Sequence, residues 1–353
     1  MSARREDIWK DGEYSYEAAY GFVPNLRFYL HDKEDAGQGR TFMLVVPGGG
    51  YCMVVPPEAE SVAKEFYDRG MNCAVLTYTT DITMSVPLGK QPLQDISRAV
   101  RYIRRNAARL GAEGAKLVIC GFSAGAHVCG TLAVHYSDVV DPDPELAGIS
   151  NRPDAVILSY PVITSGEFTH IYSMWALIGK DGPKDEYEYF SLEKHLTPDT
   201  PPVFLWQTVE DDLVPVENSM MFAEACRKAG VPYAYYAFPH GPHGLSIHTD
   251  AWRRGEFGEP YTMEQVMRAV EAVREGRGVR VSDARRAELI EQFDAFAPAA
   301  ENRAPGSDDG TAAPQGEAPD KEGEERTPDN QAPKYEDVAL WPDLAEAWLR
   351  KIL

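Results

Sequence analysis

Basic residues are scarce in this chain of 353 residues. Lysine and arginine number 35 against 55 aspartates and glutamates, which leaves a formal net charge of −20. Nucleic acids and anionic membrane surfaces attract proteins through clustered positive charge, and so acidic a chain opposes such binding. The composition therefore argues against a nucleic-acid partner and against a membrane-surface partner.

Long apolar runs are missing as well. No stretch reaches the roughly 18 consecutive apolar residues that a membrane-spanning helix needs. Residues 1–7 are not followed by the apolar segment of a signal peptide. We therefore expect no membrane span, no signal peptide and a cytoplasmic location.

Cysteine is infrequent, and its positions match no metal-binding pattern. The five cysteines are odd in number, widely spaced and mostly set within apolar runs. This favours buried, reduced thiols over a disulfide framework. No spacing of cysteine and histidine is typical of a zinc site, so we expect no metal.

Apolar runs of strand length alternate with segments of helical periodicity over most of the chain. The expected strands cover residues 25–31, 41–46, 73–78, 116–120, 155–160, 203–206 and 233–238, and the expected helices cover residues 56–69, 92–110, 124–136 and 217–229. This alternation predicts an α/β fold with a mostly parallel sheet covered by helices on both faces. In such sheets, functional sites form beyond the carboxyl ends of the strands.

One strand-to-helix junction carries the pattern Gly-x-Ser-x-Gly. Gly121, Ser123 and Gly125 stand between the expected strand at 116–120 and the expected helix at 124–136. In this context the serine is held on a tight turn with its hydroxyl exposed, and its neighbours must be small because strand and helix approach closely. The start of the helix also offers backbone N–H groups to a developing oxyanion. Ser123 is therefore a candidate nucleophile.

Two later strands are followed by side chains that could complete a catalytic triad. A nucleophilic serine needs a base, and the base needs an orienting acid; in this topology the acid precedes the histidine. Three acids follow the strand at 203–206 and two histidines follow the strand at 233–238, namely Glu210, Asp211, Asp212, His240 and His243. The spacing alone leaves open which acid and which histidine act, since the others can belong to a solvated turn or a helix cap.

A glycine-rich loop ends the early strand at 41–46. Residues 48–50 are all glycine, and glycine lets a backbone approach a substrate carbonyl closely. We assign the oxyanion donors to the N–H groups of Gly49, Gly50 and Ala124, the last being the residue after the candidate nucleophile. A phosphate-binding loop would need Lys followed by Ser or Thr, and Tyr51 and Cys52 stand there instead.

Six motifs together carry a family resemblance. They are PGGGY at 47–51, QPLQD at 91–95, GFSAGAH at 121–127, SYPVIT at 159–164, DDLVPVEN at 211–218 and HGPHGL at 240–245. With them the chain resembles α/β-hydrolase esterases of the acetyl-xylan-esterase-like group, which are related to hormone-sensitive-lipase-like enzymes. The resemblance covers roughly residues 25–249 and the C-terminal helix. One departure is Pro47, where lipase relatives have histidine.

The resemblance implies an α/β-hydrolase fold and a triad of Ser123, His243 and Asp211, because the family's acid and histidine fall on the last two positions. It implies a serine esterase without cofactor that removes small acyl groups, most of all acetyl, from sugars or xylo-oligosaccharides. We expect substrate contacts from four residues of the surrounding loops: Tyr51, Phe122, Pro161 and Trp175. The alternatives are a generic short-chain carboxylesterase, a peptidase of the prolyl-oligopeptidase type, and a non-catalytic binding protein. Homo-oligomer formation is left open.

The chain divides by composition into four parts. Residues 1–250 form the expected core, in which the aromatic-rich segment 161–201 resembles a cap. Residues 251–299 are an insertion with two charged helices, expected at 261–275 and 282–296. Residues 300–334 are rich in Pro, Gly and acidic residues, a composition that predicts a disordered linker. Residues 335–353 have helical apolar spacing and are expected to dock on the core.

Overall fold

The computed structural model describes residues 4–32, 41–277, 281–301 and 335–353. The strands of this described part form one eight-stranded sheet in the order β1-β2-β4-β3-β5-β6-β7-β8. Their bounds are β1 Arg4–Asp7, β2 Asn25–Tyr29, β3 Phe42–Val46, β4 Asn72–Thr77, β5 Leu117–Phe122, β6 Ala155–Ser159, β7 Val203–Thr208 and β8 Tyr233–Phe238.

The sheet is parallel from β4 through β8, and β2 pairs with β1 and β4 in antiparallel fashion. The carboxyl ends of the parallel strands therefore meet at one edge. The register brings Val46 at the end of β3 opposite Gly121 in β5, and Phe122 opposite Ser159 in β6. The loops that follow these three strands consequently start side by side.

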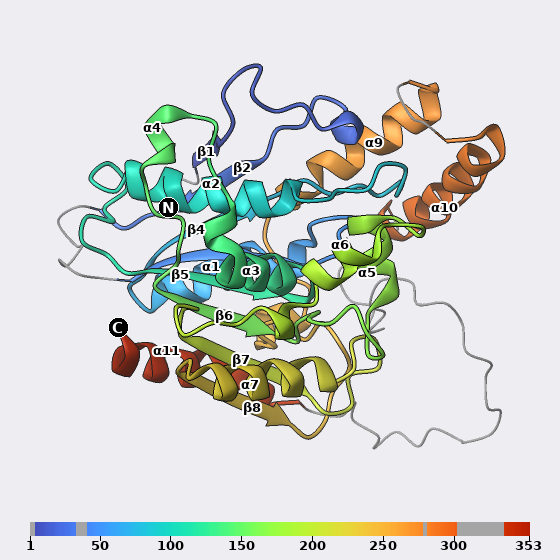
Figure 1. Ribbon diagram of the computed structural model, residues 1–353. Helices are drawn as coiled ribbons and strands as arrows, with labels where there is room; N and C mark the ends of the chain where they lie inside the picture. Colours follow the sequence, from blue (N-terminus) through green and yellow to red (C-terminus); the bar gives the residue numbers. More distant parts are fainter. Residues whose placement is uncertain (1–3, 33–40, 278–280, 302–334) are drawn as a thin grey trace, which may run out of the picture.

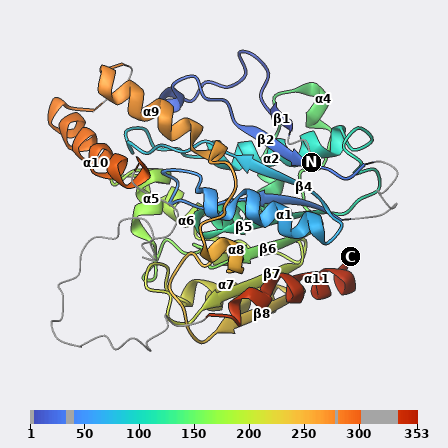
Figure 2. The ribbon, with the colours of Figure 1, turned by 180° about the vertical axis from the view of Figure 1, so that it is seen from behind.

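Helices cover both faces of the sheet, as Figure 1 and the reverse view in Figure 2 show. Helices α2, α3 and α7 lie on one face, and α1, α8 and α11 lie on the other. The bounds are α1 Glu60–Asp68, α2 Gln91–Arg105, α3 Ser123–His135, α4 Pro144–Ala147, α5 Ile171–Ile178, α6 Lys184–Tyr189, α7 Glu217–Ala229, α8 Asp250–Arg253, α9 Glu264–Glu275, α10 Asp283–Glu301 and α11 Trp341–Ile352. Single turns of 3₁₀ helix occur at Glu17–Ala19, Pro56–Glu58, Tyr136–Asp138, Leu192–Lys194, Tyr261–Met263 and Val338–Leu340.

The apolar strands are buried on both faces because helices cover both. In β3, Leu44 and Val46 pack toward the cluster that includes α2, α3 and α7, and Met43 and Val45 pack toward the cluster that includes α1 and α11. Side chains alternate along a strand, so a strand covered on both sides must be apolar at every position. This is why the central strands read as unbroken apolar runs. The predicted α/β class with a mostly parallel, doubly covered sheet is confirmed.

Most expected elements are present, with shifted ends. The helix expected at 92–110 ends as α2 at Arg105, and the two charged helices expected after residue 250 appear as α9 and α10. Helices α5 and α6 lie in the cap-like segment 161–201, whose sequence has no strong periodicity and for which no helix was assigned. Most of the expected linker, residues 302–334, falls outside the described residues. After it, α11 packs on the core through Trp341, which is fully buried.

Candidate active site

Ser123 lies at the turn between β5 and α3 in a left-handed backbone conformation, with a φ of 52°. Such a φ is strained for a residue with a side chain and is typical of a serine nucleophile on a strand-to-helix turn. The flanking glycines have no room for a side chain. A Cβ on Gly121 would lie 2.5 Å from the Gly125 oxygen, and a Cβ on Gly125 would lie 2.1 Å from the Val46 oxygen.

Three side chains from the ends of β5, β7 and β8 form one chain of hydrogen bonds. Nε2 of His243 lies 2.9 Å from Oγ of Ser123, and Nδ1 of His243 lies 2.8 Å from Oδ2 of Asp211. A carboxylate can only accept, so Nδ1 carries the proton and Nε2 is left to accept the serine hydroxyl. In this tautomer, His243 is arranged as a general base toward Ser123.

Asp211 is held by four donors. Its Oδ1 accepts from the N–H groups of Leu213 at 3.1 Å and Val214 at 2.9 Å, and its Oδ2 accepts from Nε2 of Gln207 at 3.1 Å and from His243. Its carboxylate is fully buried. These bonds fix the carboxylate in its position beside His243.

The other candidate acids and the second histidine face solvent. Glu210 pairs with His240 at 2.9 Å on the surface, and Asp212 is exposed. The geometry thus brings together the residues that the family resemblance singled out and leaves the alternatives outside the site.

The glycine loop after β3 lies against Ser123. A Cβ on Gly48 would lie 2.8 Å from the Cβ of Ser123, so only glycine fits there. Gly49 and Gly50 have φ values of 125° and 62°, which turn successive peptide groups in directions that other residues resist. Within the part of the chain that the structure describes, no oxygen accepts a hydrogen bond from the N–H of Gly49, Gly50 or Ala124. These groups are therefore available to an oxyanion.

A buried carboxylate supports this loop, and no pattern in the sequence pointed to it. Glu58 is 4% exposed, and its Oε2 accepts from the Gly48 N–H at 2.6 Å while its Oε1 accepts from the Tyr160 hydroxyl at 2.7 Å. Burial raises the pKa of Glu58. The Tyr160 ring packs edge-on against His243 at 4.9 Å, and the same hydroxyl accepts from the N–H of Ser246 at 3.1 Å. Glu58 and Tyr160 thus connect the glycine loop to the loop that carries His243.

The expected substrate contacts need correction at three positions. Tyr51 is buried, and its hydroxyl bonds to Nδ1 of His127 at 2.7 Å; Phe122 is buried against the rings of Tyr160 and Trp341; Pro161 is also buried. These side chains pack beneath the loops and present no surface to a ligand. Each sits next to a residue of the site, and adjacency in sequence cannot tell which way a side chain points.

Helix α5 supplies the remaining expected contact. Trp175 is partly exposed on α5, stacked edge-on with Tyr172 at 5.3 Å and carrying the Lys180 ammonium over its ring at 4.6 Å. The same helix begins beside the glycine loop, where His170 and Ser173 lie nearest to Gly50. Neither of these two residues was a candidate from the sequence.

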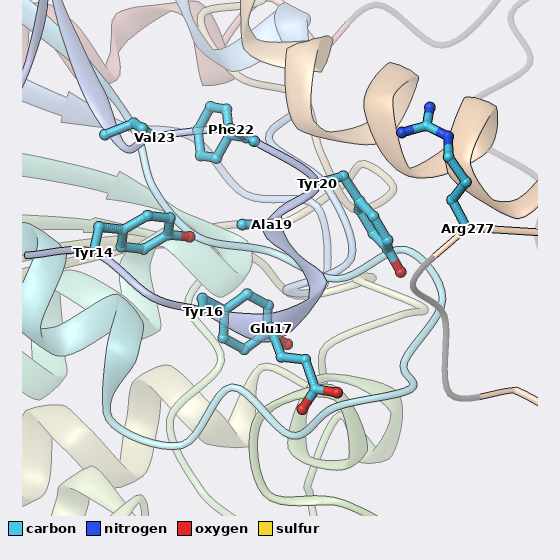
Figure 3. A pocket seen from close by; sticks show the side chains of 9 residues that line it. Tyr14, Tyr16, Glu17, Ala19, Tyr20, Phe22, Val23 and Arg277 are labelled. Carbon is cyan, nitrogen blue, oxygen red and sulfur yellow. The ribbon is translucent and has the colours of Figure 1, made fainter. Parts of the chain in front are cut away.

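A separate hollow of about 420 Å³ opens between the chain before β2 and Arg277, just after α9. Tyr14, Tyr16, Tyr20 and Arg277 are among the side chains that line it (Figure 3). None of the residues of the hydrogen-bonded triad lines this hollow. It is therefore distinct from the site around Ser123.

Three further features bear on what the chain can host. Among the described residues, no group of three or more His, Cys, Asp or Glu side chains is placed to hold a metal ion. The cysteines are unpaired, and all but the half-buried Cys52 are buried. No helix in the described ranges is long and apolar enough to cross a membrane.

Comparison with known proteins places these features in a family context. The model of the family BD-FAE matches residues 26–226. The chain is 59% identical over 269 residues to endo-1,4-beta-xylanase B of Butyrivibrio fibrisolvens, an alignment that covers 76% of this chain and 42% of that protein. It is 29% identical over 215 residues to the acetylxylan esterase of Xylanibacter ruminicola, covering 58% of this chain and 41% of that protein. The chain thus spans less than half the length of either relative.

A solved structure is similar over nearly its whole length. The crystal structure of an acetyl ester-xyloside bifunctional hydrolase from Caldicellulosiruptor lactoaceticus matches with a TM-score of 0.64 and 32% sequence identity. The match covers 75% of this chain and 96% of that one.

Proposed function

Because the chain belongs to the BD-FAE family of α/β hydrolases, we propose that it is a serine esterase that removes small acyl groups, above all acetyl, from carbohydrates such as xylo-oligosaccharides. The observation that carries this proposal is the hydrogen-bond chain from Ser123 through His243 to Asp211, beside free N–H groups. The substrate class is supported by the relatives, whose names include an acetylxylan esterase and an acetyl ester-xyloside hydrolase.

The geometry supports acyl transfer in two halves. Nε2 of His243 takes the proton of Ser123 as Oγ attacks the ester carbonyl, and Asp211 stabilises the imidazolium that forms. The N–H groups of Gly49, Gly50 and Ala124 hold the oxyanion; loss of one such donor typically slows a reaction on the order of 100- to 1000-fold. His243 then gives the proton to the leaving alcohol. In the second half it activates water, which releases the acid and restores Ser123.

Hydrolysis of the glycosidic bond is the activity that the name of the xylanase relative suggests. That chemistry commonly uses two carboxyl groups that flank the scissile bond. Here the two buried carboxylates described around the site already have other partners: Asp211 bonds to His243, and Glu58 bonds to Gly48 and Tyr160. More than half of the xylanase relative lies outside the match. The site therefore favours ester hydrolysis.

The test compares a variant of the proposed nucleophile with a matched control variant. Ser123→Ala should abolish hydrolysis of p-nitrophenyl acetate and labelling by a fluorophosphonate probe. Ser137→Ala, at an exposed serine just beyond α3, should change neither. If Ser123→Ala kept substantial turnover, the serine mechanism would be wrong.

Substrate choice needs a separate comparison. Acetate release from acetylated xylo-oligosaccharides, p-nitrophenyl esters of graded acyl length and a peptide anilide should be measured on the wild type. We expect acetyl esters of sugars to be preferred. A preference for longer acyl chains would instead favour a generic carboxylesterase, a preference for the anilide a peptidase, and no turnover together with no probe labelling a non-catalytic protein.

A further inference from the structure

A histidine that the proposed mechanism does not use lies beside the oxyanion loop. His170 stands at the amino end of α5, and its Cε1 lies 4.0 Å from the position that a Cβ on Gly50 would take. Oγ of Ser173 lies at the same 4.0 Å from that position. The two side chains therefore face the loop that is expected to bind the ester carbonyl.

One nitrogen of this ring is occupied and the other is open. Nδ1 of His170 lies 2.8 Å from Oγ of Ser173. Among the residues described by the structure, Nε2 has no hydrogen-bond partner. Burial lowers the pKa of His170 to about 4, with His243 lowering it further and Asp211 opposing the shift. The ring is thus neutral near pH 7, and in either tautomer Nε2 can bond to a hydroxyl group, because a hydroxyl both donates and accepts.

The ring is held on a fixed support. The His170 carbonyl accepts from the N–H groups of Ser173 at 3.1 Å and Met174 at 3.4 Å, which anchors the start of α5. Two residues earlier, the carbonyl of Phe168 accepts from Nδ2 of Asn218 in α7 at 2.8 Å. A rigidly placed side chain can select between substrates because little ordering is needed when the substrate binds.

We propose that Nε2 of His170 binds a hydroxyl group on the alcohol part of the ester, next to the scissile bond. This inference rests on the proposed esterase function and deepens it. An acetyl group is a methyl and a carbonyl, and the carbonyl oxygen faces the N–H groups of the glycine loop. We therefore place Nε2 of His170 on the alcohol side of the ester, because the acetyl group has no further polar atom and its carbonyl oxygen already has donors in the glycine loop. The site consequently selects acetates of polyols, such as sugars, over acetates of simple alcohols.

The experiment uses two esters that differ in one hydroxyl. Racemic trans-2-hydroxycyclohexyl acetate carries a hydroxyl beside the ester, as a pyranose ring does, and cyclohexyl acetate lacks it. The quantity measured is the ratio of their kcat/KM values. We expect the wild type to prefer the hydroxy ester. His170→Phe should reduce this ratio about three- to tenfold, the factor that corresponds to the loss of one neutral hydrogen bond.

Three further variants separate hydrogen bonding from structure. His170→Asn retains a polar group near Nδ1 but none at Nε2, so it should lose the preference as His170→Phe does. His170→Gln reaches the place of Nε2 and should keep part of it. His195→Phe makes the same change in the same connecting segment, where Nε2 of His195 bonds to the Glu188 carbonyl at 2.8 Å on the surface, and it should leave the ratio unchanged.

The outcomes distinguish this inference from the function on which it rests. If the wild type hydrolyses both esters and His170→Phe and His170→Asn leave the ratio unchanged, the inference is wrong and the esterase function stands. If the wild type hydrolyses neither these esters nor p-nitrophenyl acetate, and Ser123 does not react with the fluorophosphonate, both this inference and the proposed esterase function are wrong.

Discussion

Replacement of Asp211 by asparagine tests the hydrogen-bond chain at its most constrained point. Oδ1 of Asp211 accepts from two backbone N–H groups, those of Leu213 and Val214. The amide oxygen of asparagine must therefore take the place of Oδ1, because an NH₂ group there would face two donors. The NH₂ group is then left at the place of Oδ2, where it faces one fixed donor, Nε2 of Gln207 at 3.1 Å, and lies 2.8 Å from Nδ1 of His243.

This orientation gives His243 the wrong tautomer. The amide NH₂ donates to Nδ1, so the ring proton moves to Nε2, which can no longer accept the proton of Ser123. A tautomer error of this kind lowers kcat on the order of 10,000-fold, or about 5 kcal/mol of transition-state stabilisation. The substitution changes neither the volume of the side chain nor the carbonyl-binding loop, so KM should change far less than kcat.

The assay is steady-state hydrolysis of p-nitrophenyl acetate by Asp211→Asn and by Asp212→Asn. Asp212 is the adjacent residue and is exposed, so its variant should stay within about twofold of the wild type, as is usual for surface substitutions. Thermal melting of both variants checks that they are folded. An Asp211→Asn variant within tenfold of the wild type would refute the assigned role, and a severe defect in Asp212→Asn would transfer it to the neighbouring acid.

Two other predictions follow from buried groups near the site. Glu58→Gln replaces one carboxyl oxygen by an NH₂ group, so the side chain can no longer accept from both Gly48 and Tyr160. The kcat for p-nitrophenyl acetate should fall roughly 10- to 100-fold, the cost of leaving a buried donor without its acceptor. An unchanged kcat would show that the glycine loop does not need this support. His127 is fully buried, and burial lowers its pKa to about 4, so the unfolded chain binds a proton between pH 6.5 and 4 that the folded chain does not. Protonation of this residue in the unfolded chain should therefore lower the free energy of unfolding by about 2 kcal/mol from pH 7 to pH 5. Denaturant titrations at the two pH values measure this loss of stability, and it should be about 2 kcal/mol smaller in His127→Asn than in the wild type.

The central part of the fold could be predicted because the sheet is buried on both faces. Apolar strands of this kind are recognisable by composition, and their carboxyl ends must meet at one edge. The polar side chains placed just after β5, β7 and β8 were therefore expected to converge, and Ser123, Asp211 and His243 are hydrogen-bonded in the structure. Their roles in catalysis stay predictions until variants are measured.

Elements without a distinctive periodicity were missed. Helix α5, with the sequence IYSMWALI, is apolar on most of its surface and largely buried, so it lacks the amphipathic spacing by which a surface helix is found. Strand β1, with the sequence RRED, pairs only with β2 at the edge of the sheet and has no apolar pattern. The extended conformation of such a strand depends on its pairing with the neighbouring strand, not on its own sequence pattern.

Glu58 and His170 could not be assigned because their surroundings come from distant parts of the chain. Glu58 bonds to Tyr160, 102 positions away, and His170 faces Gly50, which follows a different strand. A lone acid at the start of a helix is ordinarily solvated, and a lone histidine in a polar segment ordinarily lies on the surface. Only the packed structure shows that Glu58 is buried and His170 half-buried beside the site.

The loop that carries His243 also explains why the last helix returns to the core. Three residues after His243, the backbone and side chain of Ser246 are fixed from three directions: its N–H donates to the Tyr160 hydroxyl at 3.1 Å, its hydroxyl donates to the Pro57 carbonyl at 2.9 Å, and its carbonyl accepts from Nε1 of Trp341 at 2.8 Å. The first two bonds link the loop that carries His243 to Tyr160 and to Pro57, next to Glu58, and the third links it to α11. A base must stay within hydrogen-bond reach of its nucleophile to act. Helix α11 therefore belongs to the machinery that holds His243 in place, although it lies at the opposite end of the sequence from the glycine loop.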